Sequence, residues 1–483
     1  QGTEYEVGED CVSVTLAKDG RTVSLSELRQ GLESASWAGD LSLPVPYTTT
    51  AAQVLSAQDI HDAVAGEMKN AGYDPATKSI TPEQLGADFD VTAAQAALDA
   101  LLDKAKRYGI AVILDGVFNH TGDDSRYFNR YGTYPDTGAY QSPDSPYHDW
   151  YEFSEWPDRY ASWWGIPILP KLNHKNDVCR SFFTGVDGVG ARYIRRGIAG
   201  WRLDVADELS DDFLDEFHAS VRAAGEESAR KPVIIGEVWE NAAEKTAYGR
   251  RRRYLQGGQL DSVMNYPLRD ALIAFLMAQK DAAAVAKELS SLAQNYPKPF
   301  LYALMNLMGS HDRPRILNVL AGNDGSDIPR SQRADHRLSQ EERMIGALRE
   351  QLMLRFVFSV PGMPCIYYGD EAGMDGYRDP FNRRCFPWGQ ENEPLQAFYA
   401  SLARLKKESP ALRRGDVTVV EAGNGRLLFL RKVAGQTLAV CCNRSQQPWR
   451  LPNGGRLRLG GGLLECTEDF VVLGGCGYCV IER

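Results

Sequence analysis

Four short apolar runs in the middle of the chain each end in polar side chains. They span residues 110–120, 198–205, 233–239 and 304–312. A short, continuous apolar run bounded by polar residues is typical of a buried strand. Carboxylates that follow successive parallel strands meet at one end of a (β/α)8 barrel, where such barrels build their active sites. The pattern therefore predicts an α/β fold, a (β/α)8 TIM barrel.

The spacing of the acidic residues agrees with repeated strand-and-helix units. Asp204 and Glu237 lie about one such unit apart, and Asp312 follows with room for two more. The strand in between is expected at residues 260–266. If residues 110–114 form the third strand, then Asp204, Glu237 and Asp312 follow strands four, five and seven.

Helical and β patterns complete the layout. Apolar residues recur with helical spacing before the third strand, and Gly109 closes that helix. The expected helices span residues 93–108, 212–224, 340–353 and 395–407. The eighth strand and its loop are expected at 363–371. Short β runs with glycine turns near the end of the chain predict an antiparallel β domain; they span residues 426–433, 437–442 and 469–473.

These patterns divide the chain into three regions. Residues 1–90 form a divergent N-terminal region, where the first two barrel strands are not recognisable and are expected to be incomplete. Residues 91–410 form the barrel, which a loop-rich insertion interrupts at about residues 121–173. Residues 411–483 form the C-terminal β domain, a β-sandwich.

Arg202 and Asp204 lie two residues apart on one predicted strand, so their side chains point to the same face. One interpretation is an ion pair that closes a strand end. The other is a carboxylate that the guanidinium keeps ionised, and therefore available as a nucleophile.

Together the four apolar runs resemble the signature regions of the α-amylase family of glycoside hydrolases. The matching stretches are Asp115–His120, Gly200–Asp204, Gly236–Trp239 and Ser310–Asp312. Two more stretches, Leu169–Asn173 and Val205–Glu208, are similar to motifs of the neopullulanase, cyclomaltodextrinase and maltogenic amylase branch. That branch more usually has Asn where this chain has Asp207. The resemblance covers roughly residues 100–483.

The resemblance implies a retaining mechanism with three carboxylates. Asp204 would be the nucleophile that forms a covalent glycosyl-enzyme. Glu237 would be the general acid and then the base, which requires a raised pKa. Asp312 would hold sugar hydroxyls and stabilise the transition state. In retaining enzymes the nucleophile and the acid lie about 5–5.5 Å apart.

Further residues are assigned to substrate binding through the same resemblance. His120 and His311 would donate hydrogen bonds to the sugar, and Arg202 would orient Asp204. Glu208 would bear on acceptor binding, or would instead be a charge at a helix N-terminus. Trp239 is also assigned to substrate binding, and Tyr73 is the candidate for a tyrosine that stacks on the sugar. In the insertion, aromatic residues such as Trp150, Trp156, Trp163 and Trp164 form either a small core or a sugar-stacking wall.

Composition limits the partners and cofactors. The net charge of −10 argues against nucleic acid or an acidic membrane surface as the main partner, so the expected partner is an α-glucan. The basic run at residues 250–253 is interpreted as a solvated helix face. Asn119 could bind calcium by analogy with some family members, but no calcium-loop pattern is present, and no other metal or cofactor is expected. Nine cysteines include one C-x-x-C pair, Cys476 and Cys479, whose intervening residues are interpreted as a turn; no zinc site is completed.

Reduced, scattered thiols suggest the cytoplasm, although a start at Gln1 leaves a processed or secreted form open. No apolar stretch is long enough for a membrane-spanning helix. Members of the branch often dimerise, so a homodimer is one expectation.

The main functional hypothesis is a retaining hydrolase of α-1,4 glucosidic bonds, with α-1,6 bonds as a second target. Its substrates would be maltooligosaccharides, cyclodextrins, pullulan or starch. The alternatives are a transglycosylase or an isomerase that forms trehalose or isomaltulose, and a non-catalytic glucan-binding homologue.

Overall fold

The computed structural model describes residues 20–23, 47–50 and 91–483. The chain divides into two compact units, residues 1–91 and 92–483. In the first unit, strands β1 (Gly20–Val23) and β2 (Tyr47–Thr50) pair antiparallel. Tyr73, the candidate stacking residue, lies outside the described residues.

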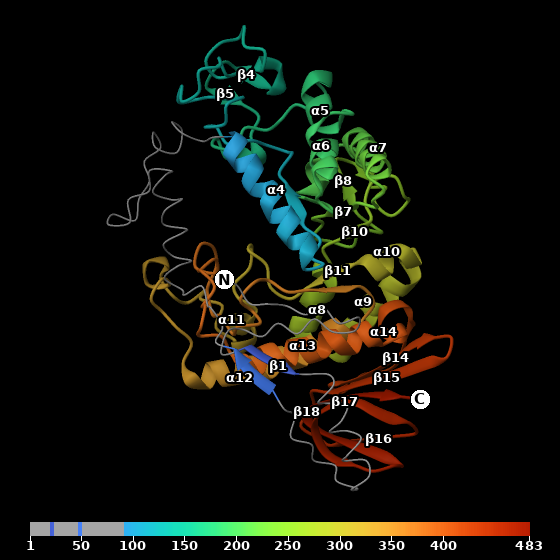
Figure 1. Ribbon diagram of the computed structural model, residues 1–483. Coiled ribbons are helices and arrows are strands. Elements are labelled where there is room, and N and C mark those ends of the chain that lie inside the picture. The colour runs from blue at the N-terminus through green and yellow to red at the C-terminus, as the bar shows by residue number, and fades with distance from the viewer. Residues whose placement is uncertain (1–19, 24–46, 51–90) are drawn as a thin grey trace. The chain divides into compact units, whose positions relative to one another are not determined.

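Six parallel strands form the centre of the second unit. They are β3 (Ile113–Gly116), β6 (Gly200–Leu203), β7 (Val233–Gly236), β10 (Ser262–Val263), β11 (Met305–Leu307) and β12 (Met363–Cys365). β3, β6, β7 and β10 are neighbours in that order, and β11 pairs with β12. A parallel bridge between Met264 and Met305 joins the two groups. These are strands three to eight of the TIM barrel, in the predicted order. Figure 1 labels β7, β10 and β11 of this group.

The third strand begins later than the sequence indicated. The backbone N–H of Ile110 donates to the carbonyl of Ala105, so Ile110 still closes the preceding helix. Gly109 has a φ of 66°, the left-handed conformation that ends many helices. The strand therefore starts at Ile113 rather than at Ile110.

Helices follow the strands and cover the sheet. They are α4 (Val91–Arg107), α5 (Asp177–Thr184), α6 (Val189–Arg196), α7 (Asp211–Glu227), α8 (Tyr266–Leu276), α9 (Ala282–Asn295), α10 (Lys298–Ala303), α11 (Ile316–Ala321), α12 (Gln340–Ser359), α13 (Glu393–Glu408) and α14 (Pro410–Arg414). The hydroxyl of Ser210 caps α7, and Ser339 and Glu342 form a capping box at the start of α12. α12 continues six residues past the predicted end at Met353, because the residues there, including Phe356 and Phe358, are buried.

Six antiparallel strands, hydrogen-bonded into one connected sheet, form the C-terminal domain and confirm that it is an antiparallel β domain. They are β13 (Asp416–Gly423), β14 (Arg426–Val433), β15 (Gln436–Asn443), β16 (Trp449–Pro452), β17 (Arg456–Cys466) and β18 (Phe470–Glu482). The order is β13–β14–β15–β18–β16, and β17 also pairs with β18. β18 is long enough to pair with β16 along its first part and with β15 along its second.

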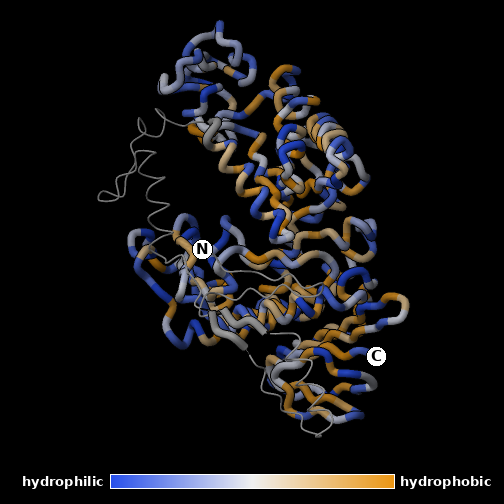
Figure 2. Tube along the Cα trace, in the orientation of Figure 1, coloured by the Kyte–Doolittle hydropathy of each residue, from blue (hydrophilic) through white to orange (hydrophobic). Residues whose placement is uncertain are grey.

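Both faces of the inner strands β14 and β15 are buried. Leu427 and Phe429 of β14 belong to the main core, which also contains Phe356 of α12. Leu428 lies between them and joins a second core with Trp449 on the other face. Alternate strand residues point to opposite faces, so the inner strands β14 and β15 have runs of consecutive buried apolar residues. β13 and β17 have many exposed residues, and Figure 2 shows hydrophobic and hydrophilic segments mixed in this domain.

The insertion after β3 has little regular structure. It contains the short pair β4 (Phe153–Glu155) and β5 (Arg159–Tyr160), and two 3₁₀ turns, η1 (His148–Trp150) and η2 (Trp163–Gly165). Phe128, Trp150 and Tyr151 are buried together in an aromatic core. Other 3₁₀ turns are η3 (Ala206–Glu208) and η4 (Arg330–Gln332).

Two local predictions were wrong. The basic run is not a helix face: Arg250 and Arg251 form β9, which pairs with β8 (Thr246–Ala247), and Arg252 is buried with its guanidinium on the carbonyl of Leu209. The residues between Cys476 and Cys479 do not form a turn either, because they lie inside β18. Within residues 91–483, every cysteine is free.

Candidate active site

A pocket of about 640 Å³ opens at the carboxyl ends of β6 and β7. Asp204 and Glu237 come directly after these strands, and Asp312 follows β11. Parallel strands bring their carboxyl ends to one edge of the sheet, which explains why residues distant in sequence meet there. The predicted residues that line the pocket are Asp204, Glu208, Glu237, Trp239 and Asp312.

Arg202 joins three carboxylates at the floor of this site. Its Nη1 lies 2.8 Å from Oδ1 of Asp115 and 2.8 Å from Oδ1 of Asp204, and its Nη2 lies 2.8 Å from Oε2 of Glu237. Burial alone would lower the pKa of Arg202, but Glu237, Asp115 and Asp204 outweigh burial and raise this pKa. The guanidinium therefore stays charged and orients Asp204 and Glu237 toward the same space.

Glu237 is buried and held through both of its oxygens. Oε2 accepts a hydrogen bond from the backbone N–H of Val205 at 2.9 Å, and Oε1 accepts from Nε1 of Trp239 at 3.0 Å. Burial raises the pKa of Glu237, the charges of Asp204 and Asp312 add to this, and Arg202 and the Val205 N–H oppose it. A carboxyl with a raised pKa can hold a proton near neutral pH, as a general acid requires.

The two predicted histidines do not line the pocket themselves, but each contacts a residue that does. His311 lies with Nε2 3.4 Å from Oδ1 of Asp312. His120 is buried and stacks on Trp163, with ring centroids 5.0 Å apart. Burial lowers the pKa of His120 against the opposing charge of Asp204, so the neutral ring, with one N–H donor, is favoured.

Glu208 lines the pocket and lies in the first turn of the short 3₁₀ helix η3. Lys171 donates to its Oε2 at 2.7 Å, and the hydroxyl of Tyr248 donates to the same oxygen. The first turn of α7 instead contains Asp211 and Asp212. Both interpretations of Glu208, in acceptor binding and as a charge at a helix N-terminus, therefore stay predictions.

Sequence reasoning missed Tyr248 and gave no role to Lys171. Tyr248 and Gly249 form the two-residue turn between β8 and β9, with φ angles of 53° and 73°. Two consecutive positive φ angles are typical of a type I′ hairpin turn. A Gly in the second turn position, between two short segments, was the available signal.

Asp207 also lies in the pocket wall, with both oxygens bound. Tyr254 donates its hydroxyl to Oδ1 at 2.7 Å, and Nζ of Lys245 lies 2.9 Å from Oδ2. Lys245 also lies 2.5 Å from Glu240. The unusual Asp at this position is therefore neutralised by a lysine that sequence reasoning did not identify.

The aromatic residues of the insertion divide between the two predicted roles. Trp150 is in the buried core, whereas Trp163 and Trp164 line the pocket. Trp164 is 80% exposed and stacks on Trp163, with centroids 5.1 Å apart. An exposed aromatic ring at a pocket mouth can pack against the apolar face of a sugar.

Asn119, the candidate calcium ligand, is buried, and its Oδ1 has no hydrogen-bond partner. Among the residues that the structure describes, no group of three or more His, Cys, Asp or Glu side chains could hold a metal ion. Ca²⁺ takes six to eight oxygen ligands, and these include amide and backbone carbonyl oxygens as well as carboxylates. Calcium binding through Asn119 therefore stays a prediction.

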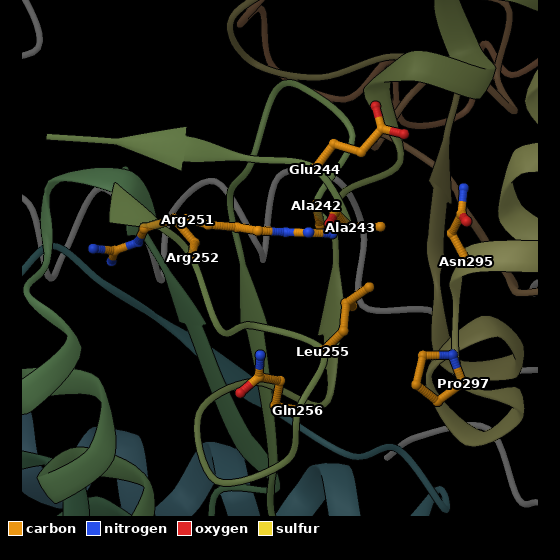
Figure 3. Close-up of a pocket in the computed structure, with 9 residues that line it drawn as sticks. All are labelled: Ala242, Ala243, Glu244, Arg251, Arg252, Leu255, Gln256, Asn295 and Pro297. Carbon is orange, nitrogen blue, oxygen red and sulfur yellow. Dashed lines mark hydrogen bonds between the residues drawn. The ribbon is translucent and has the colours of Figure 1, made fainter. Parts of the chain in front are cut away.

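A second pocket, of about 360 Å³, lies behind the β8–β9 hairpin (Figure 3). Arg251 and Arg252 come from β9 and the residue after it, and Leu255 from the following loop. Asn295 and Pro297 come from the end of α9 and beyond. None of the predicted site residues lines this pocket, so the candidate site is the one between Asp204, Glu237 and Asp312.

A barrel whose strand ends carry three acidic side chains in one pocket defines the class of barrel glycoside hydrolases. Residues 92–414 match the family model described as the α-amylase catalytic domain. The chain belongs to the α-amylase family.

No helix in the part of the chain that the structure describes is both long and apolar enough to cross a membrane.

Several known proteins are similar to this chain. An amylopullulanase of Thermoanaerobacter thermohydrosulfuricus is 35% identical over 367 residues, which is 69% of this chain and 23% of that protein. A cyclomaltodextrinase of Geobacillus thermopakistaniensis is 33% identical over 370 residues, 74% of this chain and 55% of that protein. A cyclic α-maltosyl-(1→6)-maltose hydrolase structure from Arthrobacter globiformis matches with a TM-score of 0.65 and 27% identity, covering 80% and 79% of the two chains. The chain thus spans less than a third of the amylopullulanase and about half of the cyclomaltodextrinase.

Proposed function

We propose that this chain is a retaining α-glucan hydrolase that cleaves α-1,4 bonds, with α-1,6 bonds as a second target. The observation that carries the proposal is the pair of carboxylates, Asp204 and Glu237, that one arginine holds at the floor of a single pocket. Asp312 lines the same pocket. The names of the relatives support substrates such as pullulan, cyclodextrins and maltooligosaccharides.

We assign one role to each carboxylate. Asp204 attacks the anomeric carbon while Glu237 gives its proton to the leaving oxygen, so a covalent glycosyl-enzyme forms. Glu237, now anionic, then takes a proton from water, which attacks the same carbon and releases Asp204. Asp312 and the two histidines hold the sugar hydroxyls as charge develops on the ring.

Transfer to a sugar acceptor is the second candidate reaction. Glu208 lines the pocket, and Lys171 and Tyr248 hold its carboxylate in place. A fixed carboxylate beside the reaction centre can accept hydrogen bonds from an incoming sugar, which would then compete with water. Hydrolysis and transfer differ in their products, since only hydrolysis raises the number of reducing ends.

The test is product analysis on pullulan, β-cyclodextrin and maltotriose with the full chain and with Asp204→Asn. We expect reducing-end release by the parent chain and a loss of at least about 10³-fold in the variant, because the nucleophile is removed. Panose from pullulan would indicate α-1,4 cleavage, and maltotriose from pullulan would indicate α-1,6 cleavage. Glucan binding without turnover by the parent chain would support the non-catalytic alternative instead.

Dimerisation and a cytoplasmic location also stay proposals. Sedimentation at several protein concentrations tests whether the chain dimerises.

A further inference from the structure

Arg313 follows Asp312 directly and lies against aromatic rings rather than a carboxylate. Its guanidinium carbon lies 4.4 Å from the centre of the Trp239 ring and 6.0 Å from that of Tyr266. Its Nε is buried without a hydrogen-bond partner. Among the described residues, no acidic side chain forms an ion pair with Arg313, so the cation–π contact is its main recorded side-chain interaction.

Trp239 connects Arg313 to Glu237. Its indole is stacked on Tyr266, with centroids 4.2 Å apart and planes 5° apart. Tyr266 is fully buried, so it is a rigid support. From this fixed plane, Nε1 of Trp239 donates to Oε1 of Glu237 at 3.0 Å.

We propose that Arg313 and Trp239 form a positioning pair for Glu237, in which the guanidinium holds the indole so that its N–H stays on Oε1. This inference rests on the proposed function, since it concerns how the acid of that reaction is aligned. It also adds a role for Trp239. Tyr266 stacks on the indole and Arg313 lies against the ring, while Trp239 still lines the pocket and is 36% exposed. The indole can therefore hold Glu237 in addition to contacting the sugar.

The indole N–H matters because Glu237 has to act first as an acid and then as a base. A donor on Oε1 favours the carboxylate form and so opposes the rise in pKa that burial causes. The other groups that face Glu237 are Arg202 and the Val205 N–H, which also favour the anion, and Asp204 and Asp312, which favour the acid.

The test compares two substrates that differ in their need for an acid. The sugar leaving group of maltotriose is poor and must be protonated, whereas the 4-nitrophenolate of 4-nitrophenyl maltoside leaves with little help from an acid. We expect Arg313→Ala to lower kcat on maltotriose about tenfold and on the aryl maltoside less than about threefold. Trp239→Phe, which keeps the ring but removes the N–H, should show the same contrast at least as strongly.

Three further measurements separate positioning from general structural damage. The double variant Arg313→Ala/Trp239→Phe should match Trp239→Phe within about twofold, because Arg313 acts through the indole. Both single variants should shift the alkaline limb of the kcat/KM profile to higher pH, since a donor to the carboxylate is weakened. Arg313→Lys keeps a cation and should recover part of the loss. Arg450 of the C-terminal sheet is the matched control, because its guanidinium carbon lies 3.6 Å from the centre of the Phe470 ring. Arg450→Ala should leave kcat unchanged on both substrates.

Equal losses on both substrates, or additive effects in the double variant, would overturn the positioning role. If the parent chain turns over neither substrate, the proposed function itself has failed, and the two failures are therefore distinguishable.

Discussion

Glu237 is buried between a guanidinium and an indole N–H, and its chemistry depends on when it holds a proton. Burial raises its pKa, so the acid form persists to higher pH than for an exposed carboxyl. Activity should therefore fall on the alkaline side, as pH rises through the pKa of Glu237. The acid limb reports the loss of the anionic nucleophile instead.

Replacing Glu237 by Gln tests this assignment. We expect kcat on maltotriose to fall by about 10³-fold and the alkaline limb to disappear from the pH profile, because no proton remains to be lost. Glu244→Gln, which changes an acid of the second pocket, should leave the profile as it is. A Glu237→Gln variant that kept its alkaline limb would assign that limb to another group.

At the scale of elements, α12 and the loop after β12 bury two acids that the proposed reaction does not use. Burial raises the pKa of Glu350 to about 8, and burial raises that of Asp370 to about 7 although Arg315 opposes it. Both folded-state pKa values lie above the unfolded ones, so the stability from their protonated forms is complete below about pH 4 and is lost as pH rises through 7 and 8.

Glu350→Gln should therefore change the pH dependence of stability. The variant cannot ionise, so its melting temperature relative to the parent should rise between pH 5 and pH 9, by several degrees. Glu341→Gln, on the exposed first turn of α12, is the control and should show no such trend. A constant difference across this range would mean that Glu350 does not titrate there.

At the scale of the whole described unit, a buried arginine ties the barrel to the C-terminal sheet. Arg431 of β14 donates to the carbonyls of Ser359 at the end of α12, of Leu412 in α14 and of Gly415. Arg431→Met would leave these carbonyls without donors and should lower the free energy of unfolding by about 2–4 kcal/mol. Urea unfolding measures this, and Arg450→Met in the same sheet should change it by less than about 0.5 kcal/mol.

Much of the barrel could be predicted because residues that are consecutive in the sequence mark each strand and the acidic side chain that follows it. A buried strand needs a continuous apolar run, and its acidic neighbour stands immediately after it, as at Asp204 and Glu237. The order of β6, β7, β10, β11 and β12 follows from the rule that successive units lie side by side. The basic run at Arg250 was misjudged because local composition does not separate an exposed helix from a hairpin with one buried arginine.

By itself the sequence determined the barrel strands and the C-terminal β domain, since these depend on apolar runs and periodicity. The α-amylase type and the three candidate carboxylates came from short stretches that resemble the family's signature regions. Only the tertiary structure decided which distant side chains complete the site. Lys171 reaches Glu208, Lys245 neutralises Asp207, and Arg313 packs on Trp239. These contacts join separate loops whose relative positions depend on how the strands and helices pack, and no local pattern in the chain encodes such distances.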